Sequence, residues 1–152
     1  MSRTPLVLQQ EAAECGAACL AMVLGHFGAF VPLDELRVRC GVSRNGSKAS
    51  ALVAAATTYG MIGRGLRREP ATLAGLAMPC VLFWNFNHFV VLLGFDRTGR
   101  ARLLDPALGA RTVGAAEFDT AFTGVCLVFE PGPGFTRRAD GGEPGPGPHL
   151  RR

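Results

Sequence analysis

The stretch QQEAAECGAACLAMVLGH, residues 9–26, is the most informative part of this sequence. From Cys15 onward it is rich in Ala, Leu and Met, which are good helix formers, so we predict a helix over residues 14–26. Cys15 then lies in the first turn of that helix, and Gly16 allows close backbone approach beside it. Unpaired N–H groups and the dipole at a helix N-terminus stabilise a thiolate. The position therefore favours a reactive thiol.

An inert, buried thiol is the alternative, because free cysteines are among the most buried residue types. That alternative suits Cys19, one helical turn further on, and Cys80 and Cys126, which lie in apolar segments. For Cys15 the local sequence leaves both interpretations open. The five cysteines are irregularly spaced and include no CxxC pair, which argues against a secreted disulfide framework and against zinc. We expect reduced thiols, no metal and no cofactor.

The rest of the first 60 residues is predicted to be helical, and the part that follows is predicted to be mainly a sheet. Short helices are expected at 32–36 and at 48–59, the second capped by Ser47 and ended by Gly60. Strands are expected at 61–68, 80–84, 88–95, 100–104, 111–113 and 125–129, with short helices at 69–76 and 115–122. Segment 88–95 is apolar on both faces and is therefore predicted to be central.

Helices followed by an antiparallel sheet give an α+β fold, with residues 1–130 as one domain. From residue 131 to 152 Pro and Gly dominate, which is typical of a linker without a core of its own. Trp84 and Phe86, near the predicted turn at 85–87, are expected in the core or in the wall of a cleft.

Composition excludes several classes of protein. Hydrophobic residues make up 48% of the chain and charged residues 18%, which is enough for a real core. The formal net charge of +4 is weak, and no basic stripe with interleaved aromatics indicates nucleic acid. No apolar stretch reaches the ~18 residues of a membrane span, and the first eight residues are too weak for a signal peptide. We expect a soluble chain that faces the cytosol.

Two further residues are candidates for a site with Cys15. His88 opens the predicted central strand directly after a turn, where a sheet presents a side chain to a cleft. If the chain turns at 97–99, Asp105 at the end of the next strand lies beside His88 and can orient its imidazole. Each has an ordinary alternative: a core histidine bonded to backbone, and an aspartate that starts an Asp-Pro turn.

An amide upstream of the cysteine supplies the fourth candidate. Gln9 can offer its N–H to a developing oxyanion. The alternative is an exposed polar residue without a chemical role, and on composition Gln10 is an equal rival.

Taken together and in this order, these motifs resemble a known family over residues 5 to about 130. The chain is similar to the papain-like cysteine peptidase domain found at the N-terminus of bacterial peptidase-containing ABC exporters for bacteriocins and lanthipeptides. The residues that carry the resemblance are Gln9 to Met22, Leu33 to Arg37, Gly46 to Ser50, Asn87 to Leu92, Asp105 to Gly109, and Glu117 with Phe118.

The resemblance implies an endopeptidase that cuts after Gly-Gly or Gly-Ala at the end of a leader peptide. It implies Cys15 as nucleophile, His88 as base, Asp105 as orienter, and Gln9 rather than Gln10 as oxyanion donor. It also implies two partners: a precursor peptide bound through an amphipathic leader, and transmembrane and ATPase parts fused beyond the linker. Many members have Asp before the cysteine where this chain has Glu14. We expect no consequence, because no chemical role is assigned to that position.

Three other functions are considered. A non-catalytic leader-binding domain would keep the cleft without the chemistry, although all four candidate side chains are present here. An acyl- or amide-transfer enzyme could use the same triad with an amine in place of water. A structural zinc protein would need a ligand pair at finger spacing, which the sequence lacks.

Overall fold

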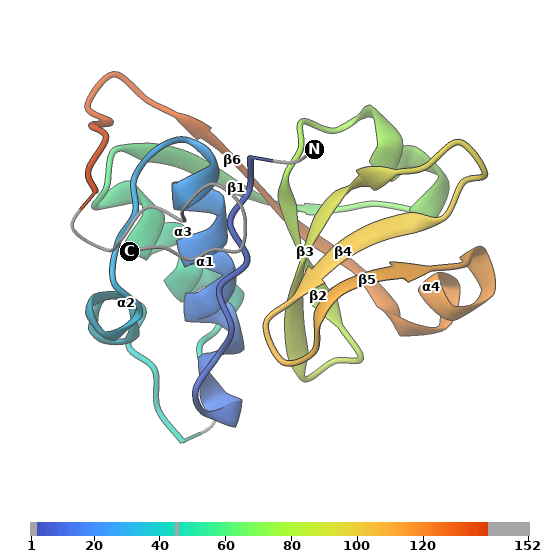
Figure 1. Cartoon of the computed structure of the whole chain (residues 1–152), viewed down its shortest axis with the longest axis horizontal. Helices are drawn as coiled ribbons and strands as arrows, with labels where there is room; N and C mark the ends of the chain where they lie inside the picture. The colour runs from blue at the N-terminus through green and yellow to red at the C-terminus, as the bar shows by residue number, and fades with distance from the viewer. Residues whose placement is uncertain (1–2, 45, 140–152) are drawn as a thin grey trace.

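The computed structural model describes residues 3–44 and 46–139. Helical elements come first, and an antiparallel sheet follows, which confirms the predicted α+β class (Figure 1). The helical elements are η1 (Ala12–Glu14), α1 (Cys15–His26), α2 (Leu33–Arg39), α3 (Ala49–Thr57), η2 (Pro70–Gly75) and α4 (Ala115–Ala121). The strands are β1 (Met61–Arg67), β2 (Cys80–Trp84), β3 (His88–Phe95), β4 (Ala101–Asp105), β5 (Gly109–Val113) and β6 (Phe122–Pro131).

The six strands form one sheet in the order β1-β6-β2-β3-β4-β5, with every neighbouring pair antiparallel. β3 lies between β2 and β4, as its two-sided apolar pattern predicts. Because side chains alternate along a strand, Phe89 and Val91 enter one hydrophobic cluster, whereas Val90 and Leu92 enter the other. The sheet therefore separates two cores.

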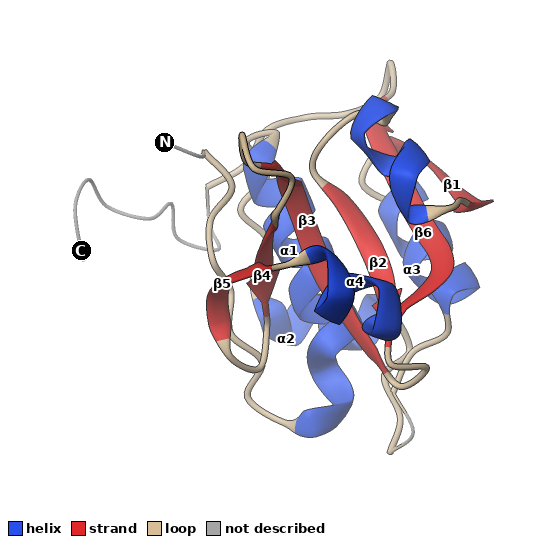
Figure 2. Cartoon of the chain, turned by 90° about the vertical axis from the view of Figure 1, so that its right-hand side faces the viewer, coloured by secondary structure: helices blue, strands red, loops and turns tan. Residues whose placement is uncertain are grey.

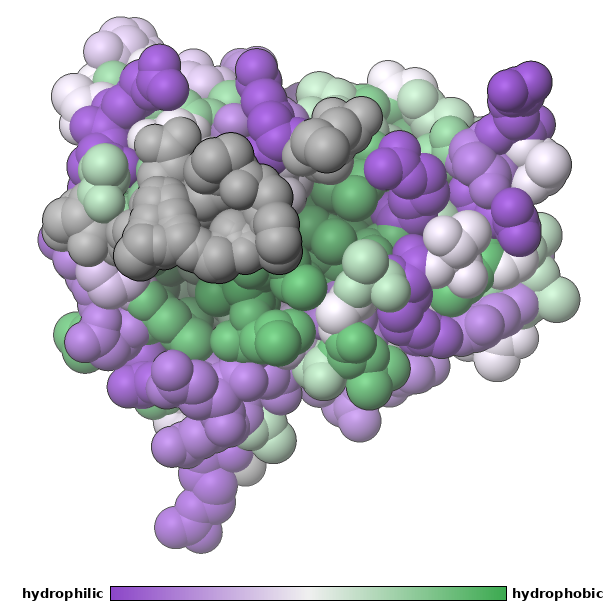
Figure 3. Space-filling model, viewed as in Figure 1, coloured by the Kyte–Doolittle hydropathy of each residue, from purple (hydrophilic) through white to green (hydrophobic). Residues whose placement is uncertain are grey.

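Helices cover both faces of the sheet, but unequally. The larger core lies under α1, α2 and α3, whereas η2 and α4 cover the smaller core on the opposite face (Figures 1 and 2). In the space-filling view, hydrophobic residues gather near the middle of the front face, between the helical half and the sheet half (Figure 3). The seam between the halves is therefore the apolar part of this surface.

Helix α1 is buried on all sides from Cys15 through Gly25. Small residues make this burial possible, because they let neighbouring elements come close. A Cβ atom added at Gly16 would lie 3.0 Å from a methyl group of Leu52, and one added at Gly25 would lie 2.5 Å from the ring of Pro5. The N-terminal segment, α3 and the sheet thus hold α1 in one place.

The helix cap predicted at Ser47 is wrong. Helix α3 begins at Ala49 with Lys48 as its N-cap, and no side chain caps it. The Ser47 hydroxyl instead donates a hydrogen bond to the carbonyl of Cys40, at 3.2 Å. Because the helix begins one residue later than predicted, Ser47 precedes the N-cap instead of occupying it.

The described part of the predicted linker contacts the helical half. Strand β6 continues to Pro131, and the Arg138 backbone then pairs with the segment after α1, between Gly28 and Phe30. The Arg138 guanidinium also forms two hydrogen bonds to the Glu35 carboxylate, at 2.8 and 2.9 Å. Residues 140–152, the remainder of the predicted linker, lie outside the described residues. Among residues 3–44 and 46–139, no helix is long and apolar enough to cross a bilayer.

Candidate active site

Cys15 is the first residue of α1, which confirms the predicted place in the first turn, one residue later than the predicted start at Glu14. The 3-10 turn η1 runs directly into α1, so the thiol lies at the N-terminal end of that helix. Cys15 is 7% exposed. The residue is therefore embedded in the helix–sheet contact and still reaches the surface.

His88 is positioned by a tight turn between β2 and β3. Asn85 and Phe86 both have positive φ, 54° and 59°, which is the backbone of a turn that matches the twist of the strands on either side. The turn sets His88 as the first residue of β3, opposite Trp84. The predicted start of the strand is confirmed.

Asp105 is brought to His88 by the β3–β4 hairpin. Because the two strands are antiparallel, the start of β3 lies alongside the end of β4, and Asp105 Oδ1 is 2.8 Å from His88 Nε2. The side chain of Asp105 is 3% exposed, and its Oδ1 also accepts the N–H of Ala107 at 2.8 Å. The expected proximity of these two residues is thus present.

The imidazole of His88 contacts both predicted partners. Burial lowers the pKa of His88, but hydrogen bonds to the Cys15 and Asp105 side chains raise it more, and the resulting pKa lies above the usual value. Since Asp105 occupies Nε2, the other ring nitrogen, Nδ1, remains for the thiol. The ring is thus hydrogen-bonded to Asp105, and the Cys15 side chain is near enough to raise its pKa.

The Gln9 backbone lies beside this cluster, whereas Gln10 is exposed. The Gln9 backbone N–H donates to the carbonyl of Pro106 at 2.8 Å, next to Asp105. The Gln9 side chain is only weakly held, by a 3.5 Å contact from Nε2 to Ala12 O. Its Oε1 is buried and has no hydrogen-bond partner among the described residues. Rotation can exchange the two ends of an amide, so the buried end can present an N–H to a ligand.

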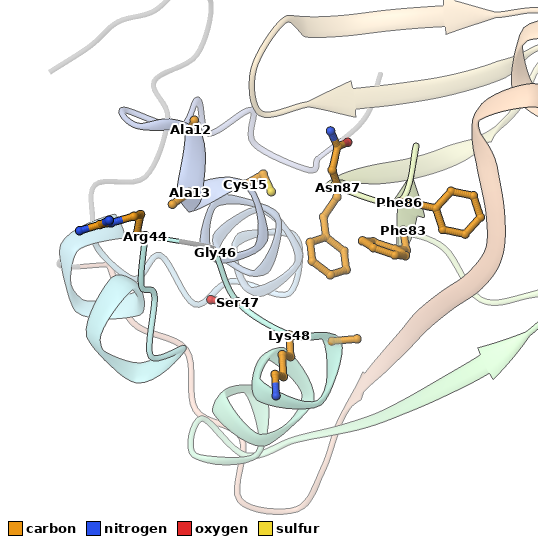
Figure 4. Close-up of a pocket in the computed structure, with 12 residues that line it drawn as sticks. Ala12, Ala13, Cys15, Arg44, Gly46, Ser47, Lys48, Phe83, Phe86 and Asn87 are labelled. Carbon is orange, nitrogen blue, oxygen red and sulfur yellow. The ribbon is translucent and has the colours of Figure 1, made fainter.

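A cleft with a volume of about 520 Å³ opens beside Cys15 (Figure 4). Cys15 lies on its α1 side, and opposite it Phe83 and Phe89 come from β2 and β3 and Phe86 from the turn between them. The charged side chains of its lining are the cations Arg44 and Lys48. The lining consists of Ala12, Ala13, Cys15, Arg44, Gly46, Ser47, Lys48, Ala49, Phe83, Phe86, Asn87 and Phe89. A cleft of this size can hold an extended or helical peptide segment with apolar side chains.

The Peptidase C39 family matches residues 3–134. The chain belongs to this family. The match spans every element of the fold and all four candidate site residues, and it confirms the resemblance drawn from the sequence.

Known relatives agree with the family and with the papain-like fold. The C39 chain is 43% identical over 133 residues to the colicin V secretion/processing ATP-binding protein CvaB of Escherichia coli. The matched residues make up 88% of this chain and 19% of that relative. The crystal structure of a double glycine motif protease from an AMS/PCAT transporter, in complex with the leader peptide, matches with a TM-score of 0.82. That structure is 49% identical, and the match covers 86% of this chain and 93% of that one.

A more distant structure shows the same fold. It is the peptidase domain of Streptococcus ComA, with a TM-score of 0.79 at 24% identity, covering 84% of this chain and 98% of that domain. The α+β architecture is thus kept at low identity.

Sequence reasoning missed part of the C39 site. The cations Arg44 and Lys48 were not singled out, because their place in the cleft depends on how the loop before α3 packs. Phe86, expected in the core or a cleft wall, lines the cleft and is 76% exposed, whereas Trp84 is 3% exposed in the smaller core. An exposed phenylalanine between two asparagines in a hairpin turn was the available signal.

The set of side chains determines which chemistry is available. A thiol, an imidazole and a carboxylate joined in series are the parts of nucleophilic acyl transfer. Within residues 3–44 and 46–139, no group of three or more His, Cys, Asp and Glu side chains is placed to hold a metal ion.

Proposed function

We propose that this C39 domain removes double-glycine-type leader peptides from bacteriocin or lanthipeptide precursors, cutting after Gly-Gly or Gly-Ala. The observation that carries the proposal is the pairing of His88 with the buried Asp105 carboxylate, near a Cys15 that lines an open cleft. The similar protease solved with a leader peptide supports the substrate class.

The arrangement supports a complete acyl-transfer cycle. His88 Nδ1 takes the Cys15 proton, and the thiolate attacks the carbonyl carbon of the small residue before the cut. The Cys15 backbone N–H and the Gln9 amide hold the oxyanion. His88 then protonates the departing amine, and water, activated by the same ring, hydrolyses the thioester. Asp105 accepts from Nε2 throughout, which keeps Nδ1 directed at sulfur.

The cleft accounts for the substrate preference. Cys15 is nearly buried, so residues without bulk next to the cut let the peptide backbone reach its sulfur. An amphipathic leader can place its apolar face against Phe83, Phe86 and Phe89. Arg44 and Lys48 then favour acidic residues on the leader.

We further propose that residues 131–152 lead toward transmembrane and ATPase parts of an exporter. The match to 19% of a secretion/processing ATP-binding protein supports this arrangement. The domain would then act at the cytoplasmic face of the membrane.

The test is cleavage of a precursor peptide by the wild-type domain and by Cys15→Ala, followed by mass spectrometry. We expect wild type to release an intact leader ending in the small pair, and Cys15→Ala to bind the precursor without cutting it. Calorimetry of the variant with the precursor measures that binding. Cleavage by Cys15→Ala would remove the nucleophile assignment.

The same experiment separates the alternative functions. A leader-binding domain would bind the precursor without cleavage even as wild type. A transferase would give a leader joined to an added amine, such as a second peptide, in place of the free carboxylate.

A further inference from the structure

Glu14 is a buried carboxylate directly before the nucleophile. It is 1% exposed, and Asp105 is the other carboxylate in the described part of the chain that is buried to this degree. Burial of an ionised carboxylate costs several kcal/mol unless the charge is paired and hydrogen-bonded. Asp105 has a place in the proposed mechanism, whereas Glu14 has none so far.

Both oxygens of Glu14 are engaged. Oε1 accepts the backbone N–H groups of Gln10, at 2.9 Å, and of Glu11, at 3.1 Å. Oε2 pairs with Nε of Arg37, which comes from α2. Burial raises the pKa of Glu14, but the hydrogen bonds from Gln10, Arg37 and Glu11 lower it more, so its pKa lies below the usual value. The side chain is therefore a carboxylate with a complete set of donors.

These contacts hold the chain on the C-terminal side of Gln9. On its N-terminal side, the Gln9 N–H is bonded to Pro106 O, beside Asp105. The Gln9 amide itself has one weak contact and one buried, unpartnered end. The backbone on either side, more than any side-chain bond, therefore decides where this amide points.

We propose that Glu14, held by Arg37, is a positioning residue that fixes the Gln9 amide over Cys15 as the oxyanion donor. The inference rests on the proposed function, in which Gln9 and the Cys15 backbone N–H stabilise the oxyanion. It gives a role to the position at which this chain has Glu14 and many family members have Asp. Because Arg37 belongs to α2, the inference also gives that helix a part in aligning the site.

The experiment uses Glu14→Gln, which keeps the size of the side chain and removes its charge. The glutamine N–H₂ group then faces Arg37, a donor against a donor. We expect kcat for precursor cleavage to fall by about 10-fold or more with KM nearly unchanged, since complete loss of one oxyanion donor costs about 10²–10³ in kcat. Arg37→Met should act the same way, and Arg39→Met, on the same helix but bonded to Thr58, is the matched control.

A double-mutant cycle with Gln9→Ala separates positioning from a general structural role. In the Gln9→Ala background, Glu14→Gln should cost little further activity, because the group it positions is gone. Alkylation of Cys15 by iodoacetamide forms no oxyanion, so its rate should stay within about twofold of wild type in Glu14→Gln. Cys15→Ala corrects for the other thiols.

Three results would overturn the inference. Equal kcat losses for Glu14→Gln with and without Gln9 would show that the two act independently. An alkylation rate that falls in step with kcat would show that Glu14 acts on the thiol or the helix. An unchanged kcat in Gln9→Ala would remove both Gln9 and Glu14 from the mechanism, yet leave cleavage by Cys15 and His88 intact. If Glu14→Gln does not fold, the same double-mutant cycle is measured with Arg37→Met in its place. The Arg37 side chain is 37% exposed, so this substitution is better tolerated.

Discussion

At the scale of single residues, the charge of the site depends on the protonation of His88. Its side chain is 19% exposed, so burial works against the imidazolium, and hydrogen bonds to Cys15 and Asp105 outweigh that effect. The raised pKa keeps the ring protonated at a higher pH than an isolated histidine, whose pKa is about 6.5. A protonated ring is needed when the amine leaves, so the raised pKa extends activity toward alkaline pH.

Asp105→Ala should therefore change both the rate and the pH profile of cleavage. We expect kcat to fall by on the order of 10²–10⁴-fold, less than in His88→Ala, because the orienter is the less costly loss. The alkaline limb of kcat/KM should move to lower pH, since one of the two groups that raise the pKa of His88 is gone. Steady-state kinetics from pH 5 to 10 measures both effects.

Asp96→Ala is the control for that measurement, because it removes an aspartate from the exposed β3–β4 turn. It should leave the profile in place. An alkaline limb that stays fixed in Asp105→Ala would mean that the carboxylate does not tune the ring.

The candidate site could be predicted where residues stand at the ends of elements. Cys15 and His88 each open an element, and Asp105 closes one, so their surroundings follow from local pattern and hairpin geometry. Local composition leaves Gln9 and Gln10 equal, and the choice of Gln9 comes from the resemblance to the family. The role of Glu14 needed Arg37, 23 residues away, which no local pattern reveals.

At the scale of elements, the contact between α1 and β3 determines whether thiol and imidazole meet. Gly16 lies in this contact: a Cβ there would lie 3.0 and 3.1 Å from the Leu52 methyl groups and 3.4 Å from Phe89. Leu52 is 1% exposed, so it has little room to move. An added methyl group would press on Leu52 of α3, so the start of α1, with Cys15, would have to shift.

Gly16→Ala should reduce activity more than stability. Overpacking costs about 1–3 kcal/mol, but alanine recovers roughly 0.5–1 kcal/mol of helix propensity over glycine. Displacement of Cys15 by a fraction of an ångström is expected to lower kcat by about 10-fold or more. Thermal unfolding and cleavage kinetics of the same sample compare the two effects.

Leu52→Val, which removes both Cδ methyl groups, should restore part of the activity when combined with Gly16→Ala. A double variant no more active than Gly16→Ala alone would argue against this contact as the cause.

Most elements followed from local pattern, and the exceptions have physical causes. Strand β3 was recognisable because residues on both of its faces are apolar, and it lies inside the sheet. The predicted Ser47 cap is wrong because α3 begins at Ala49 with Lys48 as its N-cap. Helix boundaries are uncertain by a residue or two when read from local pattern alone.

At the scale of the whole molecule, the chain after β6 returns to the helical half. Glu35 on α2 accepts two hydrogen bonds from Arg138 and one from the Tyr59 hydroxyl, at 2.6 Å. Gly60 lies under the same segment, since a Cβ atom there would be 2.5 Å from the Phe135 backbone nitrogen. The composition of residues 131–139 predicts a linker. The few contacts that hold this segment against the helical half leave no periodic pattern in the sequence, so the sequence does not reveal them.

Arg138→Ala should destabilise the domain without changing its chemistry. Both partners are about 30% exposed, at 31% and 29%, and the pairing is bidentate, so we expect a loss of roughly 1 kcal/mol and a Tm lower by about 2–4 °C. Activity at 25 °C should stay near that of wild type, since the substitution leaves the Arg37–Glu14 pair of α2 in place. Arg100→Ala, which breaks the exposed Asp96–Arg100 pair within one hairpin, is the matched control and should shift Tm by less.

The pH dependence of the Tm difference between wild type and Arg138→Ala gives a sharper test. Hydrogen bonds from Arg138 and Tyr59 lower the pKa of Glu35. A carboxylate with a lowered folded pKa contributes stability that is fully present above its ordinary pKa of about 4.5 and is lost as pH falls through the folded value. The Tm gap between wild type and Arg138→Ala should therefore be constant from pH 6 to 8 and close below about pH 4.5. A Tm difference that persists at low pH, or no Tm difference at neutral pH, would mean that Arg138 does not stabilise this segment through its ion pair with Glu35.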